Sequence, residues 1–208
     1  IWVLYFLEWD TSLSQNIILV LITLWALRIS LYILSKKLKK SGEDPRYAEW
    51  RSEWKYFKIR SFFQVYMLQM ILMCIVALPI WFMFLSLYQE SLSFTIIGAG
   101  IALFGLVFET VADWQLSQFM NIKKPGQIFT SGLYSISRHP NYFGESVFWF
   151  GISIIALQAN LFALVGWAVI TYLLLFVSGV PMLEKRYEGN KDFEEYKKKV
   201  GMFVPFLK

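Results

Sequence analysis

The stretch SFFQVYMLQMILMCIVALPIWFMFLSLYQ (residues 61–89) decides the fold class of this chain. It contains no Asp, Glu, Lys or Arg, and its only helix-breaking residue is Pro79. A helix needs about 20 predominantly apolar residues to cross the hydrocarbon core of a bilayer. This run is longer than that, so a tilt, a start at the interface or a kink at Pro79 is expected. The stretch therefore predicts a membrane-spanning helix.

The composition of the whole chain agrees with a membrane protein. Apolar residues make up 57% of the 208 residues and charged residues 17%, and the mean hydropathy is +0.48. A soluble domain carries about 25% charged residues. The aromatic share of 19% suits belts at the membrane interfaces. Cys74 is the only cysteine, which excludes an internal disulfide and argues against a cysteine-based metal site.

Four further apolar runs predict four more membrane helices, at about 14–34, 92–112, 143–158 and 161–182. The last two are joined by Ala159-Asn160, which predicts a helical hairpin. Residues 1–7 (IWVLYFL) read as the end of another helix, so we expect the N-terminus to be truncated. The prediction is one all-α domain over 1–208, a polytopic membrane bundle with five full transmembrane helices and a cofactor-binding half at about 92–208.

The distribution of basic residues predicts the orientation of this bundle. Residues 35–60 carry nine Lys and Arg, residues 121–142 carry three and the tail from 183 carries seven, whereas the opposite connections carry none. By the positive-inside rule the basic side, which includes the C-terminus, is cytosolic. This topology explains the net charge of +5 without nucleic-acid binding.

Four ionisable residues lie in or at the edge of apolar runs: Arg28, Glu109, Asp113 and Glu145. A charge at a helix centre costs roughly 2.5–3.5 kcal/mol on insertion scales, so such residues usually pair or face a water-filled cavity. We expect all four in the cytosolic half, around one polar cavity that admits a charged cofactor. The alternative is that they snorkel or form separate structural ion pairs, as in a non-catalytic scaffold.

A dense polar motif, SISRHPNYFGES (135–146), precedes the run at 143–158 and holds the only histidine, His139. Pro140 and Asn141 suit a helix start. With no second His and no Cys pair nearby, a zinc site is not indicated. A nucleotide-binding GxGxxG after a strand is also absent from the sequence. The tail at 184–208 has Phe193 and Tyr196 among charges, which predicts an interfacial amphipathic helix.

Several motifs together resemble a known family. GEDPRYAEWR (42–51), FETVADWQL (108–116), GLYSISRHPNYFGE (132–145), SGVPMLEKRY (178–187) and FEEYKKKVGMFVPF (193–206) look like DUF1295. That family is similar to the membrane enzymes that include steroid 5-alpha-reductases, sterol reductases and isoprenylcysteine carboxyl methyltransferases. The RHPxYxG-type motif occurs in both the reductase and the methyltransferase branches, so the motif alone does not select the chemistry.

The resemblance implies a set of site residues. Tyr142 and Glu145 are the implied catalytic residues, with Tyr142 a candidate to donate a proton or a hydrogen bond to the substrate. The implied cofactor-binding residues are Arg28, Tyr32, Arg46, Tyr47, Asp113, Arg138, His139, Asn141, Glu184 and Arg186. One departure concerns the substrate: steroid reductases have a Tyr three positions before the first of these arginines, and this chain has Trp25.

From this resemblance we expect an integral membrane oxidoreductase acting on CH–CH groups. It would transfer hydride from NADPH to a conjugated C=C bond of a lipid-soluble, steroid-like or isoprenoid-like substrate. The alternatives are a methyltransferase that uses S-adenosylmethionine on a lipid or prenylated substrate, and a non-catalytic scaffold. The expected partners are the bilayer and a small lipid-soluble molecule, without nucleic acid or metal. The expected location is the bacterial inner membrane or the endoplasmic reticulum.

Overall fold

The computed structural model describes residues 11–39, 51–124 and 126–208 of the chain. All regular structure in those ranges is helical. The principal helices are α2 (Leu13–Lys39), α4 (Phe57–Ser61), α5 (Leu68–Val76), α6 (Leu78–Leu85), α7 (Leu92–Ile122), α8 (Pro140–Ala156), α9 (Ala163–Tyr172), α10 (Val180–Glu184) and α11 (Lys191–Lys199). One π-helical segment, η1 (Phe62–Met67), joins α4 to α5, and a second, η3 (Leu173–Val177), follows α9. There are also two short 3₁₀ helices, η2 (Gly132–Ser135) and η4 (Lys185–Tyr187), and residues 51–53 are α-helical.

Four of the described helical stretches are long and apolar enough to cross a membrane: 13–35, 57–76, 92–122 and 163–187. The protein is therefore a multi-pass membrane protein. The prediction of five full spans is confirmed only in part. The run predicted at 143–158 is indeed a helix, α8, but its 17 residues fall short of the ~20 that a full span ordinarily needs. The helix predicted to end at residue 7 lies outside the described residues.

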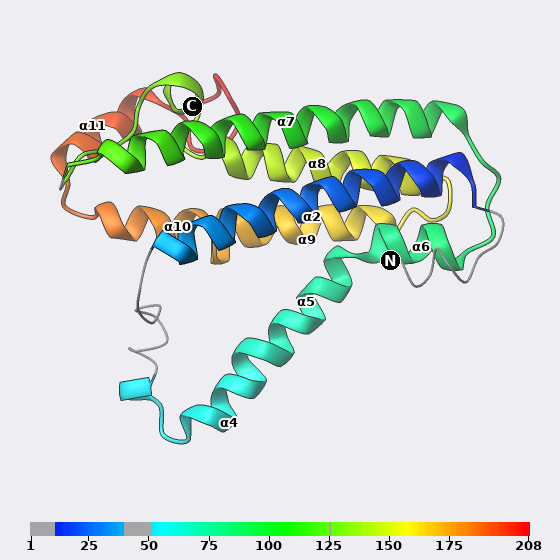
Figure 1. Cartoon of the computed structure of the whole chain (residues 1–208), viewed down its shortest axis with the longest axis horizontal. Helices are drawn as coiled ribbons and strands as arrows, with labels where there is room; N and C mark the ends of the chain where they lie inside the picture. Colours follow the sequence, from blue (N-terminus) through cyan, green and yellow to red (C-terminus); the bar gives the residue numbers. More distant parts are fainter. Residues whose placement is uncertain (1–10, 40–50, 125) are drawn as a thin grey trace.

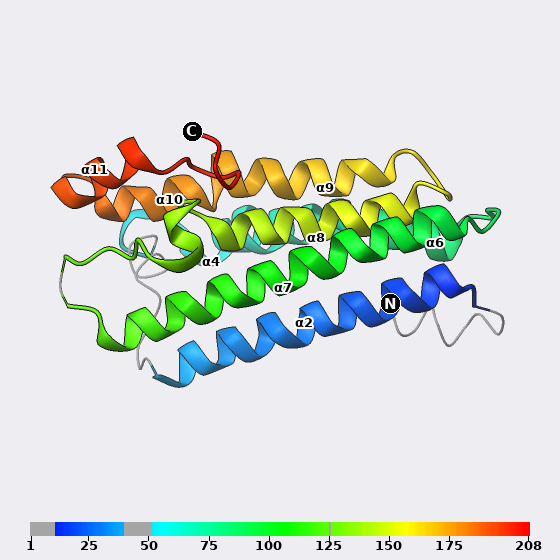
Figure 2. The ribbon, with the colours of Figure 1, turned by 90° about the horizontal axis from the view of Figure 1, so that it is seen from above.

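Long helices α2 and α7 and the shorter α8 and α9 lie side by side across the molecule in the order α2, α7, α8, α9 (Figure 2). Fully buried apolar side chains such as Ile18, Phe148, Ile152 and Ile155 fill the space between them. Large apolar side chains elsewhere on the long helices remain exposed, for example Leu31 of α2 and Phe104 of α7. In a membrane protein such faces meet lipid.

Glycines bring α7 and α8 into backbone contact. A Cβ atom added at Gly105 would lie 2.3 Å from the backbone nitrogen of Phe148, and one at Gly151 would lie 2.3 Å from that of Ala102. Small residues at a helix crossing let two backbones approach closely, which is a common basis of packing in membranes. The crossing runs along nearly the whole of α8 (Figure 1). It therefore fixes which residue of α7 faces which residue of α8.

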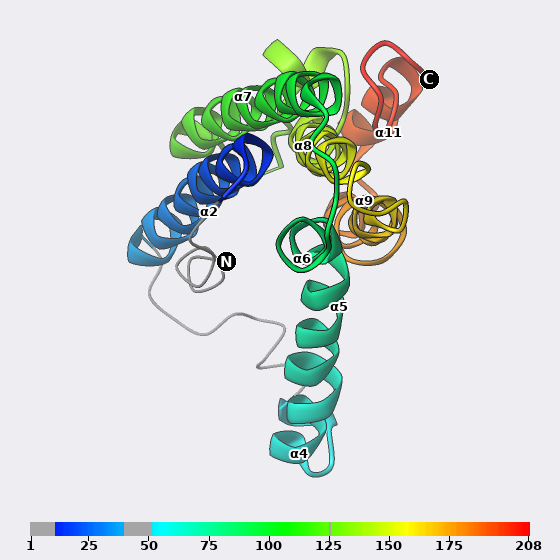
Figure 3. The same cartoon turned by 90° about the vertical axis from the view of Figure 1, so that its right-hand side faces the viewer.

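The uncharged run at 61–89 is not one helix. It breaks at Ala77 (φ −80°, ψ 1°), and Pro79 lies in the first turn of α6. The kink predicted from Pro79 is confirmed. The segment that contains α4, η1 and α5 turns away from the bundle below α6 (Figure 3).

Two predicted helices differ from their observed bounds. The helix predicted over 92–112 continues to Ile122, so Asp113 lies inside α7 and not at its exit. The predicted C-terminal interfacial helix exists as α11, but its apolar residues Phe193 and Tyr196 are buried. Tyr196 packs on the loop before α8, where the backbone carbonyl of Tyr134 accepts a hydrogen bond from its hydroxyl, and Phe193 stacks on the ring of Tyr187.

Candidate functional site

A buried ion-paired group joins α2 to α7 and α8. The Arg28 guanidinium pairs with Glu109 through Nη2 and with the Asp113 Oδ2 atom at 2.7 Å through Nη1. Glu109 and Asp113 are four residues apart, so both lie on one face of α7. The Asn141 side-chain amide donates to the other Asp113 oxygen at 3.4 Å. We refer to Arg28, Glu109, Asp113 and Asn141 as the Arg28 cluster.

Glu145 lies beside this cluster because a glycine, Gly144, lets α8 touch α7. A Cβ atom at Gly144 would lie 2.6 Å from the backbone nitrogen of Glu109, so the two backbones touch at this level. The next residue of α8, Glu145, is close enough to Glu109 and Asp113 for its carboxylate to repel theirs. It forms neither a hydrogen bond nor an ion pair with a described residue. Three carboxylates therefore gather around one guanidinium.

Part of the hydrogen-bonding capacity of this region is unused. The Glu109 Oε2 and Arg28 Nε atoms are buried and have no hydrogen-bond partner among the described residues. A buried polar atom without a partner is costly, because the protein does not replace the water that it has lost. Such atoms are expected where a ligand completes the site.

A second polar group lies at the start of α8. The His139 Nε2 atom is 2.9 Å from the Glu184 Oε1 atom of α10, and the Arg138 Nε atom is 3.2 Å from the same oxygen. The ring of Tyr142 stacks on that of His139, with centroids 5.5 Å apart and planes 10° from parallel. We refer to Arg138, His139 and Glu184 as the Glu184 cluster. Its carboxylate holds α10 against the N-terminus of α8.

The C-terminal tail clamps the loop that carries Arg138 and His139. The backbone N–H of Arg138 donates to the Gly201 carbonyl at 2.9 Å, and the Ser137 hydroxyl donates to the Phe203 carbonyl at 2.7 Å. The Tyr196 hydroxyl donates to the carbonyls of Tyr134 and Ser137, and burial raises the pKa of Tyr196 above its ordinary value. The tail thus positions the polar motif, a role that the amphipathic pattern of the sequence did not reveal.

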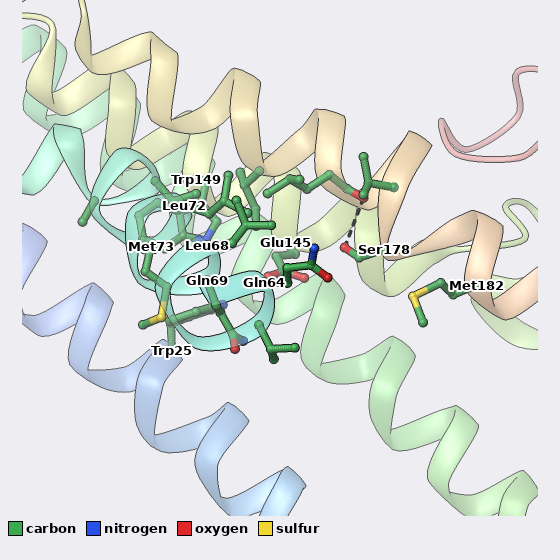
Figure 4. Close-up of a pocket in the computed structure, with 16 residues that line it drawn as sticks. Trp25, Gln64, Leu68, Gln69, Leu72, Met73, Glu145, Trp149, Ser178 and Met182 are labelled. Carbon is green, nitrogen blue, oxygen red and sulfur yellow. Dashed lines mark hydrogen bonds between the residues drawn. The ribbon is translucent and has the colours of Figure 1, made fainter. Parts of the chain in front are cut away.

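A cavity of about 610 Å³ adjoins Glu145, between the segment containing η1 and α5 and the helices α8 and α9 (Figure 4). Its lining is mostly apolar, with Leu68, Leu72 and Met73 on one side. The few polar lining groups are the side chains of Trp25, Gln64, Gln69, Glu145, Trp149 and Ser178. An apolar pocket with a few polar groups and a volume of about 300–1,000 Å³ is typical of a small-molecule site.

Two features mark this cavity as more than a packing gap. Trp25 and Trp149 meet edge to face, with ring centroids 5.4 Å apart, and neither Nε1 atom has a hydrogen-bond partner among the described residues. Both π-helical segments contribute to the lining, through Gln64 of η1 and Leu173 and Val177 of η3. Such segments often occur at functional sites, since they re-aim side chains within a helix.

Comparison with known proteins adds to this geometry. The model of the family described as "Protein of unknown function (DUF1295)" matches residues 1–200. The chain belongs to the DUF1295 family. This DUF1295 protein is also 31% identical over 122 residues to the protein-S-isoprenylcysteine O-methyltransferase of Saccharomyces cerevisiae, a match that covers 54% of this chain and 49% of that protein. The chain thus spans about half the length of this curated relative. No solved structure matches it.

The predicted site residues of the DUF1295 protein fall into three places. Arg28, Asp113 and Asn141 meet in the Arg28 cluster, and Tyr32 lies within electrostatic range of Arg28 and Asp113. The second set lies around Glu184 and comprises Arg138, His139, Tyr142, Glu184 and Arg186. In this set Arg186 is exposed and lies within electrostatic range of Tyr142. Glu145 lines the cavity. Arg46 and Tyr47 lie outside the described residues.

The predicted polar cavity is confirmed only in part. Arg28, Glu109 and Asp113 do share one place, as expected, and Glu145 lies next to them. The adjoining cavity, however, is mostly apolar, because η1, α5 and η3 line it with aliphatic side chains. Trp149, Gln64 and Gln69 were missed as lining residues; the two glutamines within an otherwise apolar run were the available signal. Among the described residues no three His, Cys, Asp or Glu side chains group to hold a metal ion.

Proposed function

We propose that this DUF1295 protein is a membrane methyltransferase that uses S-adenosylmethionine to methylate a lipid-borne nucleophile. The observation that carries the proposal is the excess of carboxylate at the site: Glu109, Asp113 and Glu145 surround a single guanidinium, that of Arg28. Charges in a low-dielectric interior select strongly for a ligand of opposite sign. The similarity to an isoprenylcysteine O-methyltransferase supports the same choice.

The sign of the charge separates the two candidate cofactors. S-adenosylmethionine carries a positively charged sulfur and an ammonium group, and both would be attracted by unpaired carboxylate. NADPH carries several negative charges on its phosphates and needs unpaired basic groups to hold them. Arg28 already pairs with two carboxylates, and Arg138 pairs with Glu184. The described part of the site therefore suits a cationic cofactor better than NADPH.

The side chains of the site would have distinct roles. Asp113, Asn141 and Glu109, whose Oε2 atom has no partner among the described residues, would bind the cationic methionine end. When bound, S-adenosylmethionine supplies a methyl group on a positively charged sulfur. Glu145, at the border between the Arg28 cluster and the cavity, would accept a proton from the lipid nucleophile as a general base. The apolar lining of the cavity would exclude water from the acceptor.

The proposal is tested by ligand titration of the purified protein in detergent. We expect S-adenosylmethionine and S-adenosylhomocysteine to raise the unfolding temperature, with at most a weak effect of NADPH. Glu109→Gln should weaken S-adenosylmethionine binding by roughly tenfold or more, because a hydrogen bond to a charged group contributes about 1.5–3 kcal/mol. Glu194→Gln, which removes an exposed carboxylate of α11, is the matched control and should bind normally.

The other hypotheses are outcomes of the same titration. Selective stabilisation by NADPH would support the membrane reductase that the motifs imply and would overturn the methyltransferase. Stabilisation by none of the three ligands would favour the scaffold. That hypothesis predicted separate partners for the intramembrane charges, whereas Arg28, Glu109 and Asp113 form one group.

A further inference from the structure

We propose that the cavity beside Glu145 takes a lipid with an uncharged hydroxyl head group, and not a lipid carboxylate. The inference rests on the proposed function and names the acceptor class for it. It comes from the chemistry of the cavity wall. Among the described residues that line the cavity only Glu145 is ionisable, and none of them is Lys, Arg or His.

A carboxylate head group would be repelled by the negative charge at this place. It would face Glu145 directly, with Glu109 close behind. Arg28, the described cation whose charge acts on Glu145, is already bound by Glu109 and Asp113. Two carboxylates that share a low-dielectric site without a cation between them do not both remain ionised at low cost. The cavity therefore discriminates against an anionic lipid head.

A hydroxyl matches the polar groups that the cavity offers. It has one O–H donor and two acceptor lone pairs. The Glu145 carboxylate can accept from the O–H, and the side-chain amides of Gln64 and Gln69 in the wall can donate to the oxygen. The Nε1–H groups of Trp25 and Trp149, two further lining residues, are buried without a described partner. Trp149 is only 5% exposed, so its N–H group is costly to leave unpaired. The apolar wall beyond these groups suits a hydrocarbon chain.

The corresponding reaction is balanced with the proposed cofactor. The O–H bond of the lipid breaks and its proton passes to Glu145, while a new O–CH₃ bond forms. The S–CH₃ bond of the sulfonium breaks with its electron pair remaining on sulfur, which becomes a neutral thioether. The product is a lipid methyl ether, and Glu145 then loses its proton to solvent.

Brominated lipids of equal chain length test the inference without requiring turnover. Purified protein is titrated at pH 8 with 12-bromododecan-1-ol and with 12-bromododecanoate, and quenching of tryptophan fluorescence is followed. A variant with both Trp25→Phe and Trp149→Phe gives the background from lipid-facing tryptophans. After this subtraction we expect the alcohol to bind at least about tenfold more tightly than the carboxylate, the factor that one hydrogen bond to a charged group supplies.

Glu145→Gln makes the test specific, because its amide carries no charge and can donate to a carboxylate. The preference for the alcohol should disappear or reverse in this variant and persist in the Glu194→Gln control. Equal or tighter binding of the carboxylate by the wild type, an unchanged ratio in Glu145→Gln, or no quenching by either lipid would overturn the inference. S-adenosylmethionine binding, measured separately, reports on the proposed function, so the two failures are distinguishable.

Discussion

At the scale of single residues, Arg28 is the point on which the buried charges depend. Its side chain is 14% exposed and pairs with Glu109 and Asp113, which are themselves largely buried. A buried ion pair contributes little net stability compared with apolar residues, but removing one partner leaves an uncompensated charge. Arg28 therefore lowers the free-energy cost of placing the two carboxylates of α7 inside the membrane.

Arg28→Met should lower the free energy of unfolding by about 3–5 kcal/mol, since Glu109 and Asp113 would lose their cation. Adding Glu109→Gln and Asp113→Asn should restore much of that loss, because no charge then remains unpaired. Arg186→Met, at an exposed position, should change stability by at most about 0.5 kcal/mol. Thermal unfolding in detergent measures all three; an Arg28→Met protein as stable as wild type would remove the ion-paired cluster as a structural requirement.

At the scale of elements, the α7–α8 crossing holds the site together. Gly105 and Gly144 allow the two backbones to touch, and this contact places Glu109 beside Glu145. Any side chain at these positions has to push the helices apart. The same face of α7 thus determines both packing and the position of the proposed acidic groups.

Gly105→Ala should destabilise the protein by about 1–3 kcal/mol, because the new Cβ atom would overlap backbone atoms of Phe148 and Gly144. It should also weaken S-adenosylmethionine binding by separating Glu109 from Glu145. Gly100, on the same helix, has no atom within 4 Å of an added Cβ. Gly100→Ala is therefore the matched control and should be neutral or stabilise by about 0.5–1 kcal/mol. Equal unfolding temperatures for the two variants would contradict the packing argument.

At the scale of the whole molecule, both polar clusters lie toward one end of the bundle. The ends of α2 and α7, the start of α8 and helices α10 and α11 occupy that end, and the turn between α8 and α9 lies at the other (Figure 1). The first end also carries the basic connections after α7 and α10. A cytosolic orientation of this end, which the positive-inside rule predicts, would give a soluble cofactor access from the cytosol.

Cysteine labelling in intact cells tests this orientation. In a Cys74→Ser background, a cysteine at Leu161 should react with a membrane-impermeant maleimide applied from outside. A cysteine at Lys124 should react only after the membrane is permeabilised, because it lies among the basic residues. Both positions are exposed, so accessibility is matched. The opposite pattern would invert the topology and leave the cofactor site facing away from the cytosol.

The sequence by itself determined the class of the protein and much of its site. Apolar run length and charge distribution predicted a polytopic helical membrane protein, and the break near Pro79 followed from the missing N–H of proline. The spacing of Glu109 and Asp113 placed both on one helix face. Because an unpaired charge is costly in lipid, the proximity of Arg28, Glu109 and Asp113 was also predictable.

Only the tertiary structure decided the partners and the shape of the cavity. Which residue of α8 faces Glu109 depends on the helix crossing, and the crossing depends on backbone contacts at Gly105, Gly144 and Gly151 that no local pattern specifies. The apolar lining likewise depends on packing: α5 contacts α9, and η1 and α5 then line the cavity opposite α8 and α9. Long-range packing of this kind joins residues far apart in sequence, and the periodicity of a single helix does not encode it.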